Sequence, residues 1–153
     1  MRAISIEYRS APAELSAQYI ELRGQTRSNP ITVDALRAFG ITAESWAQDI
    51  RTGQTEGLVA LYGAQVIGYS FGSSHTGEVL VLAVHPDYEG QGVGQRLLSL
   101  LVELLKSRGH TRLFLGCSPD PSVRSHGFYR HLGWQSTGSL DANGDEVLEL
   151  ECS

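Results

Sequence analysis

The sequence predicts an α/β fold in which a mixed, mostly antiparallel central sheet carries helices on both faces. Short apolar runs with the alternation of strands recur along the chain, and two pairs of these runs flank tight turns. Amphipathic runs with an apolar residue every three to four positions lie between them. Strands and helices mixed in this way pack as layers around one sheet.

The first third of the chain predicts one strand followed by three helices. Residues 3–8 alternate apolar and polar side chains, as a half-buried strand does. Residues 12–22 have helical apolar spacing, and the Ser-Asn-Pro segment at residues 28–30 breaks that pattern. Thr32 and Thr42 are expected N-caps of two short helices, because a threonine hydroxyl accepts hydrogen bonds from the backbone at a helix start.

The rest of the chain predicts strands and helices in mixed order. Turn residues at Gly63-Ala64 and Asn143-Gly144 indicate two hairpins. A stripe of leucines and valines between Val93 and Ser107 recurs every three to four residues, so this helix must face a sheet. The expected strands are 58–62, 66–71, 78–84, 112–117, 135–140 and 146–151, and the expected helices are 93–107 and 122–132.

The composition limits the classes of function. Hydrophobic residues make up 41% of the chain and charged residues 19%, which favours a folded domain over a disordered one. The 153 residues are expected to form one domain, residues 1–153. No apolar run approaches the ~20 residues that span a membrane. The net charge of −5 argues against nucleic acid and fits a cationic partner such as an amine.

The same features favour a cytoplasmic location. The first ten residues alternate like a strand and lack the apolar core of a signal peptide. Cys117 and Cys152 are too few to suggest a disulfide framework. The scattered histidines match no zinc spacing, so no bound metal is expected.

The most informative segment joins the apolar run Val79–Val84 to the helix that starts at Val93. Glycines at 90, 92 and 94 precede or open this helix. Such a turn exposes backbone N–H groups at a helix N-terminus, where the helix dipole favours an anion. A side chain at Gly92 or Gly94 would keep a phosphate away from those groups. A phosphate-bearing ligand is the first hypothesis, and a plain turn with a helix cap is the alternative.

The spacing around these glycines resembles that of the GNAT superfamily of acyl-CoA-dependent N-acyltransferases. The family pattern is V-x-P, five residues, then G-x-G, and here Val84-His85-Pro86 is followed by Gly92-Val93-Gly94. A second family block, an aromatic pair and then Leu-Gly-aromatic, matches residues 128–134, Phe-Tyr-Arg-His-Leu-Gly-Trp. The resemblance covers most of the chain from about residue 57 to residue 151. The family usually carries Gln or Arg where this chain has Glu89.

The resemblance implies acetyl-CoA as co-substrate, bound in a V-shaped gap between the strand ending at Val84 and the strand 112–117. Strand backbone would hold the pantetheine arm, and main-chain N–H groups of the loop would hold the phosphates. These N–H groups do not depend on the side chain at position 89, and nearby Arg96, Gln91 and Gln95 can offset the missing charge. The expected cofactor-binding residues are Leu82, Ala83, Val84, Gln91, Gly92, Val93, Gly94, Gln95 and Arg96.

Two residues are the catalytic candidates. Tyr129 matches the family tyrosine that often protonates the departing CoA sulfur, and a phenol pKa near 10 lies close to that of a thiol. Packing beside Phe128 is its structural alternative. Glu78 matches a glutamate that deprotonates the amine in some members, directly or through water. By strand alternation it shares a face with Leu82 and Val84, and burial would raise its pKa toward that of a useful base. The alternative is a solvated strand-end acid.

Other polar residues near these blocks have weaker assignments. Cys117 at a strand end is more plausibly a small buried thiol than an acyl carrier. Ser122 stands where the family often has asparagine, and a serine there can still cap the helix. Arg124 is either a ligand of a CoA phosphate or, more plausibly, a surface arginine.

The function expected from the sequence is direct transfer of an acetyl group from acetyl-CoA to a primary amine of a small molecule. A non-catalytic acyl-CoA-binding regulatory domain and a protein or peptide N-acetyltransferase are the alternatives. No nucleic acid or membrane partner is expected. Members of the family often pair, so the resemblance allows a homodimer.

Overall fold

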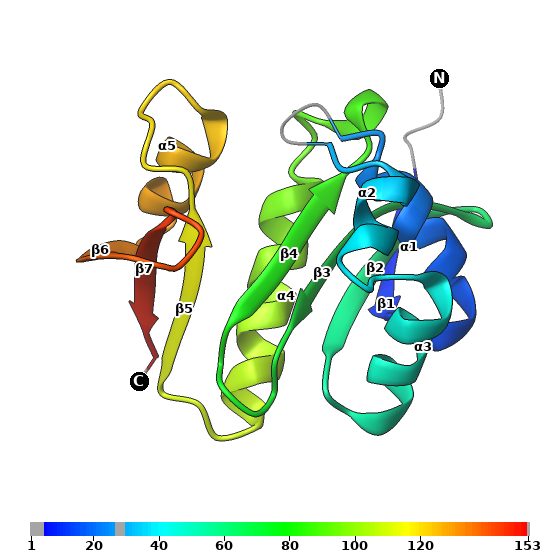
Figure 1. Ribbon diagram of the computed structural model, residues 1–153, viewed down its shortest axis with the longest axis horizontal. Coiled ribbons are helices and arrows are strands. Elements are labelled where there is room, and N and C mark those ends of the chain that lie inside the picture. Colours follow the sequence, from blue (N-terminus) through cyan, green and yellow to red (C-terminus); the bar gives the residue numbers. More distant parts are fainter. Residues whose placement is uncertain (1–4, 27–29, 153) are drawn as a thin grey trace.

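The computed structural model describes residues 5–26 and 30–152, and its elements follow the expected order (Figure 1). The strands are β1 (Glu7–Ser10), β2 (Glu56–Tyr62), β3 (Gln65–Gly72), β4 (Val79–Val84), β5 (Arg112–Cys117), β6 (Gln135–Leu140) and β7 (Glu146–Glu151). The helices are α1 (Ser16–Arg23), α2 (Val33–Ala38), α3 (Ala43–Thr52), α4 (Val93–Ser107) and α5 (Arg124–His131), with short 3-10 turns η1 (Ala13–Leu15) and η2 (Pro86–Tyr88).

The predicted caps of α2 and α3 are confirmed. The Thr32 hydroxyl accepts from the backbone N–H of Ala35 at 3.1 Å. At α3, the Thr42 hydroxyl accepts from Ser45 N–H, and the Ser45 hydroxyl accepts from Thr42 N–H. This reciprocal pair is a capping box, and it satisfies two backbone donors that the helix leaves free.

Two predicted boundaries are wrong or fall partly outside the described residues. Residues 3 and 4 of the predicted first strand, and residues 28 and 29 of the predicted helix break, lie outside them; β1 itself runs from Glu7 to Ser10. Helix α5 begins at Arg124, and Ser122 does not cap it. Instead the Asp120 carboxylate accepts hydrogen bonds from the backbone N–H and the hydroxyl of Ser122, at 2.9 and 2.8 Å. This local turn competes with the helix, as Asp side chains often do.

Over residues 5–26 and 30–152, the sheet consists of two antiparallel halves joined by one backbone bridge. One half has the strand order β1-β2-β3-β4, and the other has the order β5-β7-β6. A parallel bridge between Glu78 and Phe114 joins them, and Phe114 N–H donates to Gly77 O at 3.3 Å. From this bridge β4 and β5 diverge toward their C-terminal ends (Figure 1). The predicted mixed, mostly antiparallel sheet is confirmed, and β4 and β5 diverge in the predicted V.

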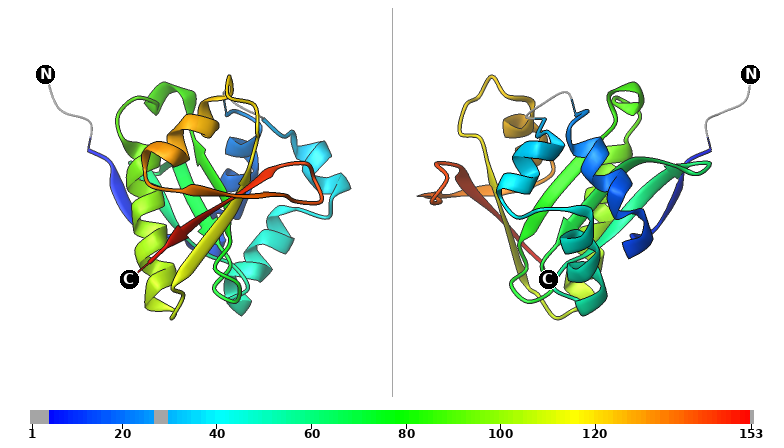
Figure 2. Two further views of the ribbon diagram at one scale, coloured as in Figure 1. Left: turned by 90° about the vertical axis from the view of Figure 1, so that its left-hand side faces the viewer. Right: turned by 45° about the vertical axis from the view of Figure 1, so that its right-hand side comes forward.

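Helices cover both faces of the first half-sheet, as predicted (Figure 2). On one face, α1 and α3 bury an aromatic cluster in which the Tyr19 ring lies 5.2 Å from Phe71 and 5.7 Å from Trp46. On the other face, Ala60 and Ile67 pack against α4. The alternation of β2 and β3 therefore sends successive side chains into two different cores.

Helix α4 also packs against the second half-sheet. Its leucines Leu98, Leu101 and Leu105 share a core with Leu113 and Leu115 of β5, Leu148 of β7 and Trp134. The same helix thus contacts both halves behind the gap. At 15 residues, α4 is too short to cross a bilayer, and none of the other described helices is long and apolar enough to do so.

We expect Leu101→Ala to lower the free energy of unfolding by about 2–5 kcal/mol, because this fully buried side chain fills the core that α4 shares with β5. Leu140→Ala is the matched control, since Leu140 is 65% exposed on β6. Chemical denaturation of both variants measures the two values. Equal losses would show that α4 does not hold the second half-sheet.

Candidate active site

The gap between β4 and β5 exposes backbone groups of β4. His85 N–H donates to Ile67 O at 2.8 Å, and bonded pairs alternate along an antiparallel ladder. Ala83 is therefore hydrogen-bonded to Tyr69, its ladder partner, whereas the peptide groups of Leu82 and Val84 point toward β5. Within the described residues, no backbone hydrogen bond joins β4 to β5 beyond the bridge at Glu78. An extended ligand can pair with this open edge.

A bulge near the bridge changes which face of the sheet the side chains of β4 occupy. Phe71 pairs with Val81 and Gly72 pairs with Val79, so Leu80 is an extra residue without a partner in the ladder. Val79 and Leu82 both pack into the core that contains the α4 leucines, although they are three residues apart. The predicted alternation, which put Glu78 on the same face as Leu82 and Val84, is therefore wrong. A bulge also bends the strand, which helps β4 to turn away from β5.

The glycine loop ends at an uncapped helix N-terminus. Gly92 is the N-cap of α4 with a φ of 80°, a left-handed conformation that favours glycine. The first helical hydrogen bond runs from Arg96 N–H to Gly92 O at 3.0 Å. The N–H groups of Val93, Gly94 and Gln95 consequently have no backbone or side-chain acceptor within the described part of the chain.

The space over the loop is open. A Cβ atom at Gly92 would meet nothing within 4 Å, and a Cβ atom at Gly94 would only touch Val84 and Phe128 at ordinary contact distances of 3.5 and 3.8 Å. Neither the helical backbone nor the packing requires glycine at position 94. The role of Gly94 in binding a phosphate stays a prediction.

Charged side chains surround the loop in an arrangement that the sequence did not predict. The Arg96 guanidinium lies over the Tyr8 ring of β1, 5.9 Å from its centre. Arg124 Nη1, at the start of α5, donates to Glu89 Oε2 at 2.8 Å. The acid before the loop is therefore neutralised by an arginine from the other side of the gap.

Tyr129 projects from α5 into the core of the second half-sheet. Its ring centre lies 5.1 Å from that of Phe128 and 6.1 Å from that of Trp134, and the ring packs in the same core as Cys117. Burial raises the pKa of Tyr129 to about 12, above the ordinary value near 10 assumed from the sequence. The phenol therefore keeps its proton throughout the neutral range. No hydrogen bond to its hydroxyl occurs within the described residues.

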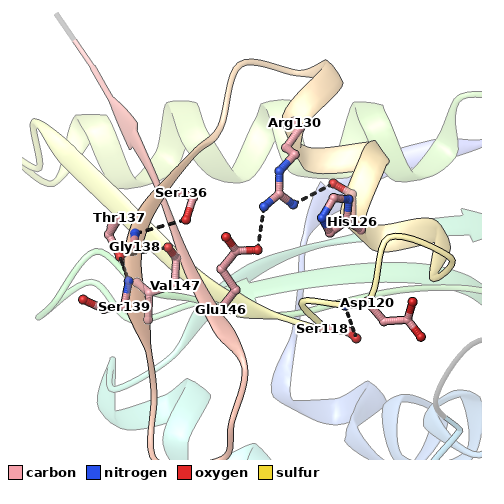
Figure 3. A network of polar contacts seen from close by, with 10 residues as sticks. All are labelled: Ser118, Asp120, His126, Arg130, Ser136, Thr137, Gly138, Ser139, Glu146 and Val147. Carbon is pink, nitrogen blue, oxygen red and sulfur yellow. Dashed lines mark hydrogen bonds and ion pairs between the residues drawn. The ribbon is translucent and has the colours of Figure 1, made fainter.

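An ion pair fixes α5 to β7 and thereby fixes Tyr129. Arg130 Nη2 donates to Glu146 Oε1, and Nη1 donates to the backbone oxygen of His126 at 3.0 Å (Figure 3). A hydrogen bond from Ser136, with the Arg130 bond, lowers the pKa of Glu146. Burial raises the pKa of the Cys117 thiol, which makes it a poor nucleophile at neutral pH. The weaker sequence alternative, a covalent acyl carrier, gains no support.

Glu78 lies at the narrow end of the gap, beside a second carboxylate. Burial, followed by the charge of Asp141, raises its pKa. Asp141 is held in the β6–β7 turn, where its Oδ1 accepts from Asn143 and Asp145 N–H at 2.8 and 3.0 Å. A Cβ atom at Gly116 of β5 would lie 2.6 Å from Asp141 Oδ2, so this carboxylate sits directly over the strand. The structure describes no group of three or more residues placed to hold a metal.

The family model of the acetyltransferase (GNAT) family matches residues 21–134, more than half of the chain. The chain belongs to this family. It is therefore an acetyltransferase of the GNAT family.

Solved structures of acetyltransferases share the GNAT fold. PaiA N-acetyltransferase from Thermoplasma acidophilum, in complex with coenzyme A, is 21% identical with a TM-score of 0.71 over 96% of this chain and 99% of that chain. The ribosomal-protein-S18-alanine N-acetyltransferase from Escherichia coli is 17% identical, with a TM-score of 0.72 over 97% and 95%. Aminoglycoside 6'-acetyltransferase type Ii is 18% identical, with a TM-score of 0.73 over 95% and 96%. The acceptors named for these enzymes include both a protein and a small molecule.

We expect the raised pKa of Glu78 to make its contribution to stability depend on pH. Ionisation is disfavoured in the fold, so the folded state loses stability as pH rises from the unfolded pKa through the higher folded pKa. Glu78→Gln should therefore become more stable relative to the wild type between about pH 4, near the ordinary glutamate pKa, and about pH 8. Denaturant titrations at both pH values measure this difference.

Glu21→Gln, at an exposed position on α1, is the matched control for this comparison. Its stability difference from the wild type should change less with pH. A relative stability of Glu78→Gln that falls as pH rises would contradict the assigned direction of the shift.

Proposed function

We propose that the protein, as a single acetyltransferase domain, transfers an acetyl group from acetyl-CoA directly to a primary amine of a small molecule. The open edge of β4 is the observation that supports this most. It lies between the free N–H groups of Val93, Gly94 and Gln95 at one end and Glu78 at the other. The pantetheine arm would pair with Leu82 and Val84, while the phosphates would bind the loop.

The proposed step needs one base and one acid. The amine nitrogen attacks the thioester carbonyl, the C–N bond forms and the C–S bond breaks. Glu78 accepts the proton that the amine loses, and its raised pKa makes it a better base. Tyr129 gives its proton to the departing thiolate. A pKa of about 12 means that the proton is always available at neutral pH.

The two proposed catalytic groups come from different parts of the fold. Glu78 bridges to Phe114 of β5, whereas Tyr129 comes from α5 and packs in the core of the second half-sheet. The base and the acid thus come from different elements. Proton transfer from the amine to Glu78 is proposed to be direct or through a water molecule.

The acceptor is proposed to arrive as an ammonium ion, which must release one proton to solvent before its nitrogen can attack. Glu78 and Asp141 lie near each other, and a Cβ atom at Gly116 would also lie 3.3 Å from Cβ of Asp145. These carboxylates and the net charge of −5 favour an ammonium group. A protein N-terminus or lysine is the weaker alternative. The cytoplasmic location and the homodimer stay predictions.

We expect the purified protein to bind acetyl-CoA with a dissociation constant on the order of micromolar or tighter. Isothermal titration calorimetry with acetyl-CoA, and with CoA as comparison, measures this. Absence of binding and of any thermal shift with both ligands would mean that the loop over α4 serves only the fold.

We expect Tyr129→Phe to lower kcat by about 100-fold or more, as loss of a general acid does, with the KM for acetyl-CoA little changed. Release of the CoA thiol with a panel of small amines and peptides measures turnover and identifies the acceptor class. Tyr62→Phe is the matched control, because Tyr62 is 45% exposed at the end of β2.

The result for Tyr129→Phe also separates the two classes of function. Full turnover in this variant would remove Tyr129 from the mechanism. Binding of acetyl-CoA by the wild-type protein, without turnover of any acceptor in the panel, would favour the non-catalytic regulatory domain.

A further inference from the structure

Glu89 and Arg124 form a contact across the mouth of the gap. Glu89 ends the turn that leads from β4 to the glycine loop, and Arg124 is the first residue of α5. Their 2.8 Å ion pair joins segments 35 residues apart in the chain. The Glu89 side chain is 19% exposed and that of Arg124 is 62% exposed, so the arginine remains accessible to a ligand.

A second contact places this face of α5 along the loop. Phe128 follows Arg124 by four residues, so the two side chains lie on one face of the helix. A Cβ atom at Gly94 would lie 3.8 Å from Phe128 Cζ. One face of α5 therefore touches Glu89 before the loop and borders Gly94 after it. The Arg124 side chain is thus held against the segment that leads into the start of α4.

The local charge favours a phosphate only when Glu89 and Arg124 are considered together. A lone carboxylate at Glu89 would repel a phosphate bound by the α4 N-terminus. The guanidinium cancels that charge, and Arg124 uses only Nη1 for Glu89. Its other donors have no acceptor within the described residues. An arginine fork can bind a carboxylate on one side and a phosphate oxygen on the other.

We propose that Arg124 binds a phosphate group of the acyl-CoA at the mouth of the gap, and that Glu89 is the positioning residue that holds its guanidinium there. Arg124 then supplies, from α5, the positive charge that the loop itself lacks at position 89. This inference rests on the proposed binding of the phosphates by the loop.

The experiment compares the wild type with Arg124→Gln. Calorimetric affinity for acetyl-CoA should fall about tenfold or more, as expected for loss of a hydrogen bond between charged groups. Turnover of acetyl-pantetheine, which has no phosphate, should stay unchanged. Arg108→Gln is the matched control, because Arg108 pairs with Glu56 just beyond the opposite end of α4. Wild-type affinity in Arg124→Gln would overturn the proposal.

The role of Glu89 is tested by a double-mutant cycle. Glu89→Gln should tighten acetyl-CoA binding in the Arg124→Gln background, where the carboxylate has lost this arginine. In the wild-type background, Glu89→Gln should not tighten binding. There Arg124 already neutralises the Glu89 carboxylate, and the substitution removes the ion pair that holds the Arg124 guanidinium in place. Equal tightening in both backgrounds would show that Glu89 does not act through Arg124.

Two further comparisons separate the outcomes. Acetyl-dephospho-CoA lacks the 3′-phosphate, so a retained effect of Arg124→Gln assigns the contact to the pyrophosphate, and a lost effect assigns it to the 3′-phosphate. Wild-type protein that fails to bind acetyl-CoA would refute the proposed co-substrate site as a whole. If the wild-type protein binds acetyl-CoA and Arg124→Gln binds it equally tightly, only the role of Arg124 is refuted.

Discussion

The packing of α4 against both half-sheets is the constraint on which the rest of the structure depends. Two strands that diverge lose the hydrogen bonds that would join them, and in the described chain the backbones of the two half-sheets pair only at the bridge between Glu78 and Phe114. The leucines of α4 bury apolar surface against both halves and compensate for those missing bonds. The gap can therefore stay open while the fold stays intact. Its unpaired strand edge and the free N-terminus of α4 are two consequences of the same packing.

Two arginines of α5 complete the gap, each with a different partner. Arg130 fixes the helix to Glu146 of β7, and Arg124 reaches across to Glu89. The first contact joins α5 to the second half-sheet, and the second joins it to the segment before the glycine loop. Both contacts are ion pairs, and such pairs orient α5 more than they add to the stability of the fold. In the proposed complex, one helix, α5, would thus contact both the departing sulfur and a phosphate of acetyl-CoA.

The local parts of the site could be predicted from the sequence because they depend on short segments. The glycines before α4 define a turn and a helix start through backbone conformation alone, and Tyr129 lies in a block of seven residues with its own helix stop. Three features could not be predicted. The bulge at Leu80 arises from the pairing of β4 with β3. Burial raises the pKa of Glu78 as the sequence suggested, but the further contribution of Asp141 comes from a distant turn. Glu89 meets Arg124 only after folding.

The sequence by itself determined the order of the elements, the hairpins, the caps of α2 and α3, and the position of the glycine loop before α4. Each of these depends on neighbours within a few residues, where apolar period, turn residues and capping hydroxyls act directly. Only the tertiary structure decided which face Glu78 occupies, how strongly Tyr129 holds its proton, and which cation neutralises the acid before the loop. These properties depend on burial and on charges brought together from separate segments, and no local pattern in the chain encodes those distances.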